Sequence, residues 1–294
     1  MIKYKYKDFV KENITMKKSI IMNQGYDTQL EKVLTYIESN LNDNLCIEEL
    51  SSICGYSRFH FQRIFKEYVG ENICVYINRL RIERSAFMLK YQYKKISSVG
   101  MRVGYNSNTS FTRAFKQYYH LSPTDFRESI LNYSCFDIET PSYEIVHIED
   151  KKVFFIRTRG DYEIYEEYAW DLFKKNYENN IYYENQYISI CYDEPTIVKE
   201  HSSLRYEACA LYDEQKHKNL DNLHFKTIKG GKYAKFCFEG TLKELDAFFY
   251  KIYYSFFHNK EYQIKFTPAF QVHHNHVDNL LHGSTKTDFY FPID

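Results

Sequence analysis

The chain has 294 residues, of which 44% are hydrophobic and 27% charged, so a disordered chain is excluded and two domains of ordinary size are expected. Its net charge is zero but unevenly spread: residues 1–135 hold 20 Lys and Arg against 13 Asp and Glu (+7), and residues 136–294 hold 19 against 26 (−7). A basic half joined to an acidic half is typical of a DNA-binding domain fused to a domain of another kind.

Residues 1–27 are rich in lysine and lack a clear periodicity, which predicts a poorly ordered N-terminal arm without an apolar signal sequence. No apolar run approaches 18 residues, so no membrane-spanning helix is expected. The seven cysteines form no C-x-x-C pair, which favours scattered thiols in a reducing cytoplasm.

Residues 47–70 predict two short helices separated by a turn. Apolar residues recur at helical spacing before Gly55 and again in FQRIFKEY, residues 61–68. Gly55 suits the left-handed turn between the helices, and Ser57 suits the N-cap of the second helix. The second helix is expected to expose four side chains, namely Phe59, Gln62, Arg63 and Lys66.

Residues 96–120 repeat this design. Gly104 provides the turn, and FTRAFKQY at 111–118 repeats the earlier eight letters fifty residues later. The outward positions of the second copy are Asn108, Thr109, Thr112, Arg113 and Lys116. Residues 75–89, between the copies, lack Gly and Pro and predict a helical spacer roughly 20 Å long or more.

Two short helices joined by a glycine turn, the second exposing Arg, Gln or Lys, are typical of a helix-turn-helix unit. Arg and Gln make bidentate contacts with base edges, whereas Lys pairs with phosphate. Two units held about 34 Å apart can enter successive segments of the major groove, so one chain is expected to act as a monomer on DNA.

The runs ELSSICGYSRFHFQRIFKEYVG, YINRLRIERS and GYNSNTSFTRAFKQYYHLSPTDFRES resemble the DNA-binding domain of AraC/XylS-family transcription regulators, over about residues 28–130. The resemblance implies that Phe59, Gln62 and Arg63 read bases in the first unit, and Thr109, Thr112 and Arg113 in the second. It also implies an all-α double helix-turn-helix domain that binds double-stranded DNA and activates transcription by recruiting RNA polymerase, although repression remains an alternative.

After Pro141 the pattern changes to strands, predicted at residues 152–160, 187–195, 204–214, 232–240 and 288–293. Helices are predicted at 163–177 and 241–257, each after a strand that ends in a glycine turn. A strand–helix–strands unit used twice indicates a pseudo-symmetric α+β domain, with a ligand cleft between its halves.

The segments VFFIRTRGDY, CYDEP, LRYEACALY, GKYAKFCFEGT and TDFYFPI resemble the GyrI-like (SHS2-repeat) effector-binding domain, over about residues 142–294. The resemblance implies a sensor of small molecules, often lipophilic cations. Gln271 stands where family members commonly carry an acidic residue, which argues against a cation-specific cleft unless Glu163, Glu207 or Glu239 replaces it. The candidate ligand-binding residues are Tyr162, Trp170, Tyr206, Phe257, Phe270 and Gln271.

Other functions are less favoured by the sequence. The chain has no P-loop, Rossmann, G-x-S-x-G or H-E-x-x-H motif, so no catalytic residue and no cofactor are assigned. His273, His274 and His276 lack a third ligand on one strand face, so no metal site is expected. Two alternatives stay open, a small-molecule hydrolase or isomerase fused to a DNA-binding domain, and a C-terminal domain that docks a protein in place of a ligand.

Overall fold

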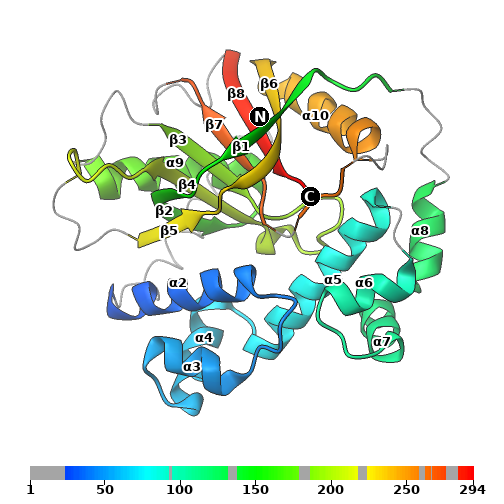
Figure 1. The fold of residues 1–294 in the computed structure, drawn as a ribbon. Helices are drawn as coiled ribbons and strands as arrows, with labels where there is room; N and C mark the ends of the chain where they lie inside the picture. The colour runs from blue at the N-terminus through cyan, green and yellow to red at the C-terminus, as the bar shows by residue number, and fades with distance from the viewer. Residues whose placement is uncertain are drawn as a thin grey trace, which may run out of the picture. The chain divides into compact units, whose positions relative to one another are not determined.

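The structure is a computed structural model, and it describes residues 24–92, 95–131, 138–178, 186–217, 224–257, 262–265, 267–275 and 284–294. The chain divides into two compact units at Arg81 and Ile82. Helix α5 (Ile73–Tyr91) runs through this division and is longer than the predicted spacer at 75–89. Figure 1 shows the elements in chain order. Each unit is described by itself.

The first unit is a small helical domain. Helix α2 (Gln24–Ser39) precedes α3 (Ile47–Cys54) and α4 (Arg58–Val69). The predicted helices and turn are confirmed: Gly55 has φ +70°, and the Ser57 side chain accepts a hydrogen bond from the His60 backbone. Residues 24–27, expected in the arm, begin α2; most of the arm, residues 1–23, lies outside the described residues.

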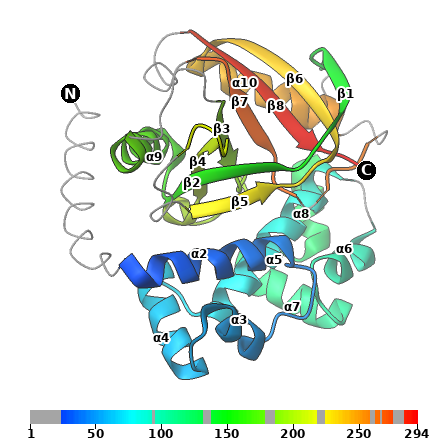
Figure 2. The same cartoon turned by 60° about the vertical axis from the view of Figure 1, so that its left-hand side comes forward.

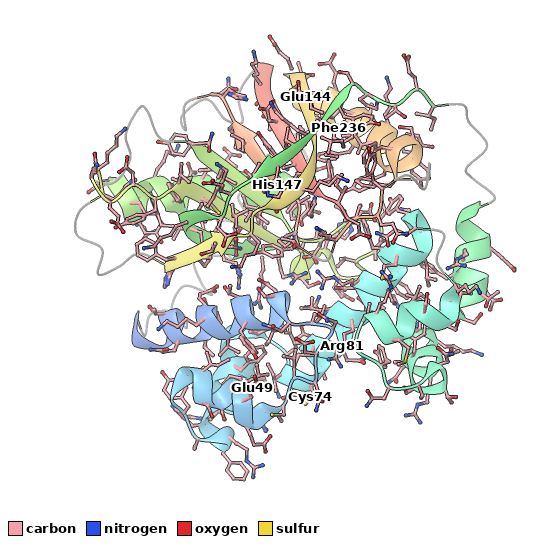
Figure 3. All side chains as sticks on the ribbon, viewed as in Figure 1. Glu49, Cys74, Arg81, Glu144, His147 and Phe236 are labelled. Carbon is pink, nitrogen blue, oxygen red and sulfur yellow. The ribbon has the colours of Figure 1, made fainter. Side chains whose placement is uncertain are left out.

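The core of the first unit consists of one side of each helix. Arg81 closes this unit by donating hydrogen bonds to the carbonyls of Leu41 and Asp43, in the connection between α2 and α3. Figure 3 labels Arg81 together with Glu49 and Cys74. The buried apolar residues that pack together are Leu30, Val33, Leu34, Ile37, Leu41, Leu50, Phe61, Ile64, Phe65, Ile73, Tyr76 and Leu80.

The second unit begins with the repeated helix pair. Helices α6 (Ile96–Arg102) and α7 (Asn108–Tyr119) are followed by α8 (Pro123–Leu131). Gly104 has φ +89°, as the predicted turn requires. Gly100 lets the two helices approach closely, because a Cβ at this position would lie 2.7 Å from Cγ of Phe111.

The rest of the second unit is an eight-stranded antiparallel sheet in the order β1-β6-β8-β7-β3-β4-β2-β5 (Figure 2). Its strands are β1 (Tyr143–Ile148), β2 (Lys151–Arg159), β3 (Tyr187–Cys191), β4 (Arg205–Leu211), β5 (His224–Ile228), β6 (Gly231–Thr241), β7 (Phe270–His273) and β8 (Ser284–Pro292). The five predicted strands are confirmed, whereas β1, β5 and β7 were not predicted. Figure 3 shows Glu144 and His147 on β1 and Phe236 on β6, its paired strand.

The strand order confirms the predicted duplication. From the central pair outward, one half reads β3-β4-β2-β5 and the other reads β7-β8-β6-β1. Each half has the chain order strand, helix, strand, strand: β2, α9 (Tyr162–Tyr177), β3, β4, and β6, α10 (Leu242–Lys251), β7, β8. Helix α10 continues as a π-helical turn, η4 (Ile252–Phe256).

Both helices begin at the positions that the sequence marks. Asp161 caps α9, and Thr241 forms a reciprocal capping box with Glu244 at the start of α10. Gly160 precedes α9 at φ +143°, and a Cβ there would lie 2.2 Å from the ring of Tyr165. Glycine is therefore required at this entrance to the helix.

Candidate DNA interface and candidate effector site

The outer face of α4 carries the predicted base-reading residues of the first unit. Phe59 is 83% exposed, and Gln62, Arg63 and Lys66 are exposed as well. Phe61, Ile64 and Phe65 are buried on the opposite side and fix the orientation of this face. An exposed phenylalanine is not accounted for by the packing of this unit.

Helix α7 presents the corresponding face of the second unit. Thr109, Arg113 and Lys116 are exposed and Thr112 is half-buried, while Phe111 and Phe115 are buried. The arginine of each F-x-R-x-F-K-x-Y string is thus exposed between two buried aromatics. That these side chains contact DNA stays a prediction.

A cluster of hydrogen-bonded polar side chains lies between α9 and the centre of the sheet. We call Glu166, Trp170, Ser189, Tyr206 and His273 the Tyr206 cluster. The Tyr206 hydroxyl accepts from Nε1 of Trp170 at 2.9 Å and donates to Oε1 of Glu166 at 3.0 Å. It also lies 2.6 Å from Oγ of Ser189, which lies 2.7 Å from Nε2 of His273.

The proton positions in the Tyr206 cluster follow from its donors and acceptors. Because Tyr206 donates its one proton to Glu166, Ser189 donates to Tyr206 and accepts from Nε2–H of His273. Nδ1 of His273 then accepts from Thr287 at 3.3 Å. Burial lowers the pKa of His273 to about 3, which keeps this imidazole neutral.

Glu166 is the carboxylate that the sequence analysis missed. Burial raises its pKa to about 7, and the Tyr206 hydrogen bond only partly opposes this shift. Its side chain is still partly exposed, and Oε2 has no hydrogen-bond partner among the described residues. The signal was available, because Tyr162, Glu166 and Trp170 are spaced four residues apart on one face of α9.

Four of the six predicted ligand-binding residues gather on this face of the sheet: Tyr162, Trp170, Tyr206 and Gln271. Gln271 pairs with Ser189 across the β7–β3 ladder, and its Nε2 lies 3.5 Å from Sγ of Cys191. The amide is 8% exposed.

Phe270 and Phe257 do not join the Tyr206 cluster. Phe270 stacks on Tyr290, with ring centroids 4.7 Å apart, in the core on the opposite face of the sheet. Neighbouring residues on a strand point to opposite faces, so Phe270 and Gln271 cannot line one site together. Phe257 packs against Phe256 and Phe291 in the core beneath α10. Phe257 therefore completes an apolar core apart from the Tyr206 cluster, and that it contacts a ligand stays a prediction.

None of the three glutamates proposed in place of the acidic residue contributes a carboxylate to the Tyr206 cluster. Glu163 and Glu239 are exposed, and no described hydrogen bond links either of them to the cluster. Glu207 is fully buried on the other face of β4, bonded to Arg157 at 2.6 Å and to Lys226 at 2.7 Å. These two cations hold the pKa of Glu207 below its ordinary value despite burial, which raises it.

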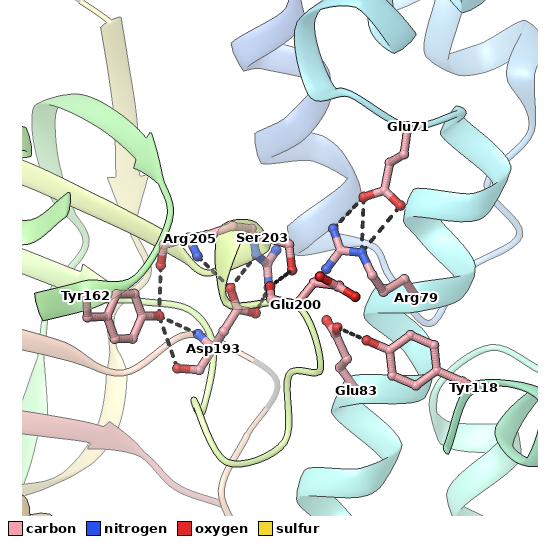
Figure 4. A network of polar contacts seen from close by, with 9 residues as sticks. All are labelled: Glu71, Arg79, Glu83, Tyr118, Tyr162, Asp193, Glu200, Ser203 and Arg205. Atoms are coloured by element: carbon pink, nitrogen blue, oxygen red, sulfur yellow. Dashed lines mark hydrogen bonds and ion pairs between the residues drawn. The ribbon is translucent and has the colours of Figure 1, made fainter. Parts of the chain in front are cut away.

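Tyr162 joins α9 to the segment after β3. Its hydroxyl accepts from the backbone N–H of Asp193 at 3.1 Å and donates toward the carbonyls of Asp193 and Arg205, each at 3.0 Å (Figure 4). The Asp193 carboxylate in turn accepts from the backbone N–H of Arg205 at 2.8 Å and from its Nε at 2.9 Å.

Within the part of the chain that the structure describes, no group of three or more His, Cys, Asp or Glu is arranged to hold a metal ion. His276 lies outside the described residues, and His274 pairs with Asp288. The six described cysteines are free thiols. None of the described helices is both long and apolar enough to cross a bilayer.

Comparisons with known proteins match both halves of the chain. Residues 141–294 match the model of the GyrI-like small molecule binding domain, and residues 50–129 match the model of a helix-turn-helix domain. Transcriptional regulator Rob of Salmonella typhimurium is 24% identical over 244 residues, which cover 76% of this chain and 82% of that protein.

Two further similarities each cover a part of the chain. The Transposon Tn10 TetD protein of Escherichia coli is 32% identical over 108 residues, covering 37% of this chain and 78% of that protein. The crystal structure of the EcmrR C-terminal domain covers 52% of this chain and 97% of its own, at 14% identity and a TM-score of 0.41.

Proposed function

We propose that α4 and α7 read an operator under the control of a small molecule bound beside Glu166. The chain belongs to the AraC-type DNA-binding transcription regulators that carry a GyrI-like small-molecule-binding domain. The observation that carries the DNA-reading part is the shared register of Arg63 and Arg113. Each is exposed between two buried aromatics of a matching helix.

Arg63 and Arg113 are suited to base recognition. A guanidinium forms a bidentate contact with guanine, and each good contact of this kind discriminates by about 1–3 kcal/mol. Lys66 and Lys116 follow one turn later on the same faces, where an ammonium group pairs with phosphate. Since one chain holds both units, we propose that it binds its operator as a monomer.

Glu166 defines the class of small molecule. Its free Oε2 accepts from a cation or another hydrogen-bond donor, and the half-buried Tyr162 supplies aromatic surface one turn before it. We propose an aromatic molecule that bears an amine, amidine or similar donor. Gln271 supplies an amide on the facing strand, and the molecule is bound without being turned over.

The DNA part of the proposal is tested by selecting duplexes from a random pool with the full chain and measuring their affinities by fluorescence anisotropy. Arg63→Ala should lose about 1–3 kcal/mol on the selected duplex and relax the base preference at one position. Glu67→Gln, exposed on the same helix, is the matched control and should keep that preference. An equal loss on random DNA would make Arg63 a phosphate contact.

The small-molecule part is tested by melting the full chain with a panel of cationic, neutral and anionic aromatic compounds. A ligand at a hundred times its Kd raises the stability by about 2.7 kcal/mol. We expect cationic compounds to stabilise the protein and Glu166→Gln to abolish their effect. A protein that no compound stabilises would favour the docking of a protein partner by this domain.

The direction of regulation is tested by transcription in vitro with purified RNA polymerase and the selected duplex placed upstream of a promoter. We propose activation through recruitment of the polymerase, which increases the transcript. A decrease at the same occupancy would assign repression.

A further inference from the structure

One short segment connects the neighbourhood of Glu166 with the second helix-turn-helix unit. We call residues 193–199 the connecting segment. It follows β3 and contains Asp193, Glu194, Thr196, Ile197 and Lys199. One end is bonded to α9 and the rest to α5 and α7, all within the second compact unit.

The first end is held by Tyr162. Its hydroxyl bonds both backbone groups of Asp193, and Asp193 is fixed further by its buried ion pair with Arg205. Tyr162 lies one helical turn before Glu166, so a molecule bound to Glu166 Oε2 would contact or displace the Tyr162 ring. A change at the proposed site therefore reaches Asp193 through a single side chain.

The remaining residues of the segment pack on the second helix-turn-helix unit. Nζ of Lys90, on α5, lies 3.6 Å from Oε2 of Glu194 and also donates to Thr196. The Lys90 and Glu194 side chains are only 10% and 12% exposed. Ile197 is buried in the core that contains Phe111 and Phe115, the inner face of α7.

Two further hydrogen bonds hold α7 to the same segment. The Tyr119 hydroxyl donates to the carbonyl of Ile197 at 3.0 Å, and Nζ of Lys199 donates to the carbonyl of Tyr118 at 2.8 Å. The Tyr118 hydroxyl donates to Glu83 on α5, as Figure 4 shows. The segment is thus anchored to α7 itself and to α5, which is bonded to α7 through Glu83.

The Lys90–Glu194 contact makes this arrangement sensitive to displacement. Burial lowers the pKa of Lys90, and Glu194 opposes that effect. Moving Glu194 away would leave a poorly solvated ammonium without its partner, which is strongly unfavourable. Small shifts of the segment are therefore expected to move α5 and α7 with it.

A second contact joins the same parts but does not reach Tyr162. Tyr91 stacks on Tyr253 of η4, with ring centroids 4.8 Å apart, and Gln92 donates to the carbonyl of Ile264. These contacts fix the end of α5 against the other half of the sheet. Among the described hydrogen bonds, those of the connecting segment join α9 to α5 and α7.

We propose that the connecting segment transmits the state of the Glu166 site to α7, so that the small molecule controls the second recognition helix. This inference rests on the proposed function, since it takes the small-molecule site and the DNA face of α7 from it. Coupling between two sites is reciprocal. If the small molecule changes the affinity for DNA, bound DNA must change the affinity of the Glu166 site for the small molecule by the same factor.

Reciprocity allows a test without a known small molecule. Trp170 is the one tryptophan in the sequence and its Nε1 is bonded to Tyr206 inside the Tyr206 cluster, so its emission reports on the site. The full chain is titrated with a duplex that it has selected in vitro. Tryptophan emission, excited where tyrosine does not absorb, is recorded together with the anisotropy of the labelled duplex.

We expect the emission of Trp170 to change along the binding curve given by anisotropy. Tyr162→Phe and Glu194→Gln should each lose most of that change, normalised to the amount of DNA bound. Tyr168→Phe also removes a hydroxyl from α9, at a half-buried position without a bond to the connecting segment, and should keep the full change.

The outcomes separate the two proposals. A chain that selects no duplex contradicts the proposed function itself. A chain that binds DNA with unchanged Trp170 emission leaves DNA binding intact and overturns the coupling. A full emission change in both Tyr162→Phe and Glu194→Gln would place the coupling elsewhere than in residues 193–199.

Discussion

The hydroxyl of Tyr206 lies 3.0 Å from Oε1 of Glu166 and is the one described hydrogen-bond donor to this carboxyl group. A single neutral donor does not compensate for the water removed from around a carboxylate. The pKa of Glu166 is accordingly raised to about 7, with burial as the larger cause and the hydrogen bond as the smaller, opposing one. We therefore expect the Glu166 carboxyl group to titrate near neutral pH.

Glu166→Gln should make the protein less sensitive to pH. A carboxyl group whose pKa is higher in the folded state binds a proton more tightly there, so its contribution to stability is full below about pH 4.5 and is lost as the pH rises through about 7. As the pH rises from about 4.5 to above 7, the free energy of unfolding of the wild type should fall by roughly 2–3 kcal/mol relative to that of Glu166→Gln.

The measurement is the free energy of unfolding in denaturant of both proteins, from acid to slightly alkaline pH. Only the difference between the two curves is interpreted, since other groups titrate equally in both. Parallel curves would show that Glu166 is well solvated or compensated by another group.

Glu207→Gln should be strongly destabilising. Glu207 has no exposed surface and bonds Arg157 and Lys226, so the substitution leaves two buried cations facing a neutral amide. Breaking a buried ion pair in this way costs about 3–5 kcal/mol. Denaturant unfolding at neutral pH measures the loss, and Glu239→Gln, an exposed glutamate on β6, is the control with an expected effect within about 0.5 kcal/mol. Equal effects of the two substitutions would contradict the buried network.

Gly100→Ala should destabilise the second unit although alanine favours helix. Helix propensity alone predicts a gain of about 0.5–1 kcal/mol. However, the new Cβ would lie 2.7–2.9 Å from Cγ, Cδ1 and Cβ of Phe111, a fully buried ring that contacts Tyr105 and Phe115. Overpacking of this kind costs about 1–3 kcal/mol, which exceeds the gain in helix propensity, so the free energy of unfolding should decrease.

Differential scanning calorimetry of the full chain follows this change. Met101→Ala, at the next and exposed position of α6, serves as the control and should unfold like the wild type. An increase in stability of Gly100→Ala would show that α6 and α7 are farther apart than the structure has them.

Phe59→Ala should separate DNA affinity from stability. Because its ring is 83% exposed, its loss should change the free energy of unfolding by no more than about 0.5 kcal/mol. Affinity for the selected duplex should fall, because the proposed contact of the Phe59 ring with thymine methyl groups is removed. Phe61→Ala, two residues further along α4, should instead cost about 3–5 kcal/mol of stability, since Phe61 is fully buried. Unchanged DNA binding by a stable Phe59→Ala protein would remove Phe59 from the interface.

The sequence predicted the elements whose pattern is local. The FQRIFKEY and FTRAFKQY stripes, the turns at Gly55 and Gly104 and the five strands all appear where expected. Strands β1, β5 and β7 were missed because they are short or mostly exposed, and their pairing partners lie up to about a hundred residues away in the chain.

The residues of the Tyr206 cluster were harder to predict, because the face of the sheet that a residue occupies is not evident from the sequence. Phe270 and Gln271 are adjacent in sequence, yet only Gln271 shares a face with Ser189. Glu166 was not predicted, because the resemblance indicated an acidic residue at the position of Gln271, on a strand, and not on a helix. Its spacing from Tyr162 and Trp170 on α9 placed it on the same face.

The duplicated sheet has a consequence for how a molecule would be oriented beside its central strands. The central strands β3 and β7 hold equivalent places in the two halves, but one contributes Ser189 and Cys191 and the other Gln271 and His273. A frame with twofold symmetry thus surrounds a centre without it. A molecule held at this centre would meet different chemistry at its two ends, so one of its two orientations would be favoured.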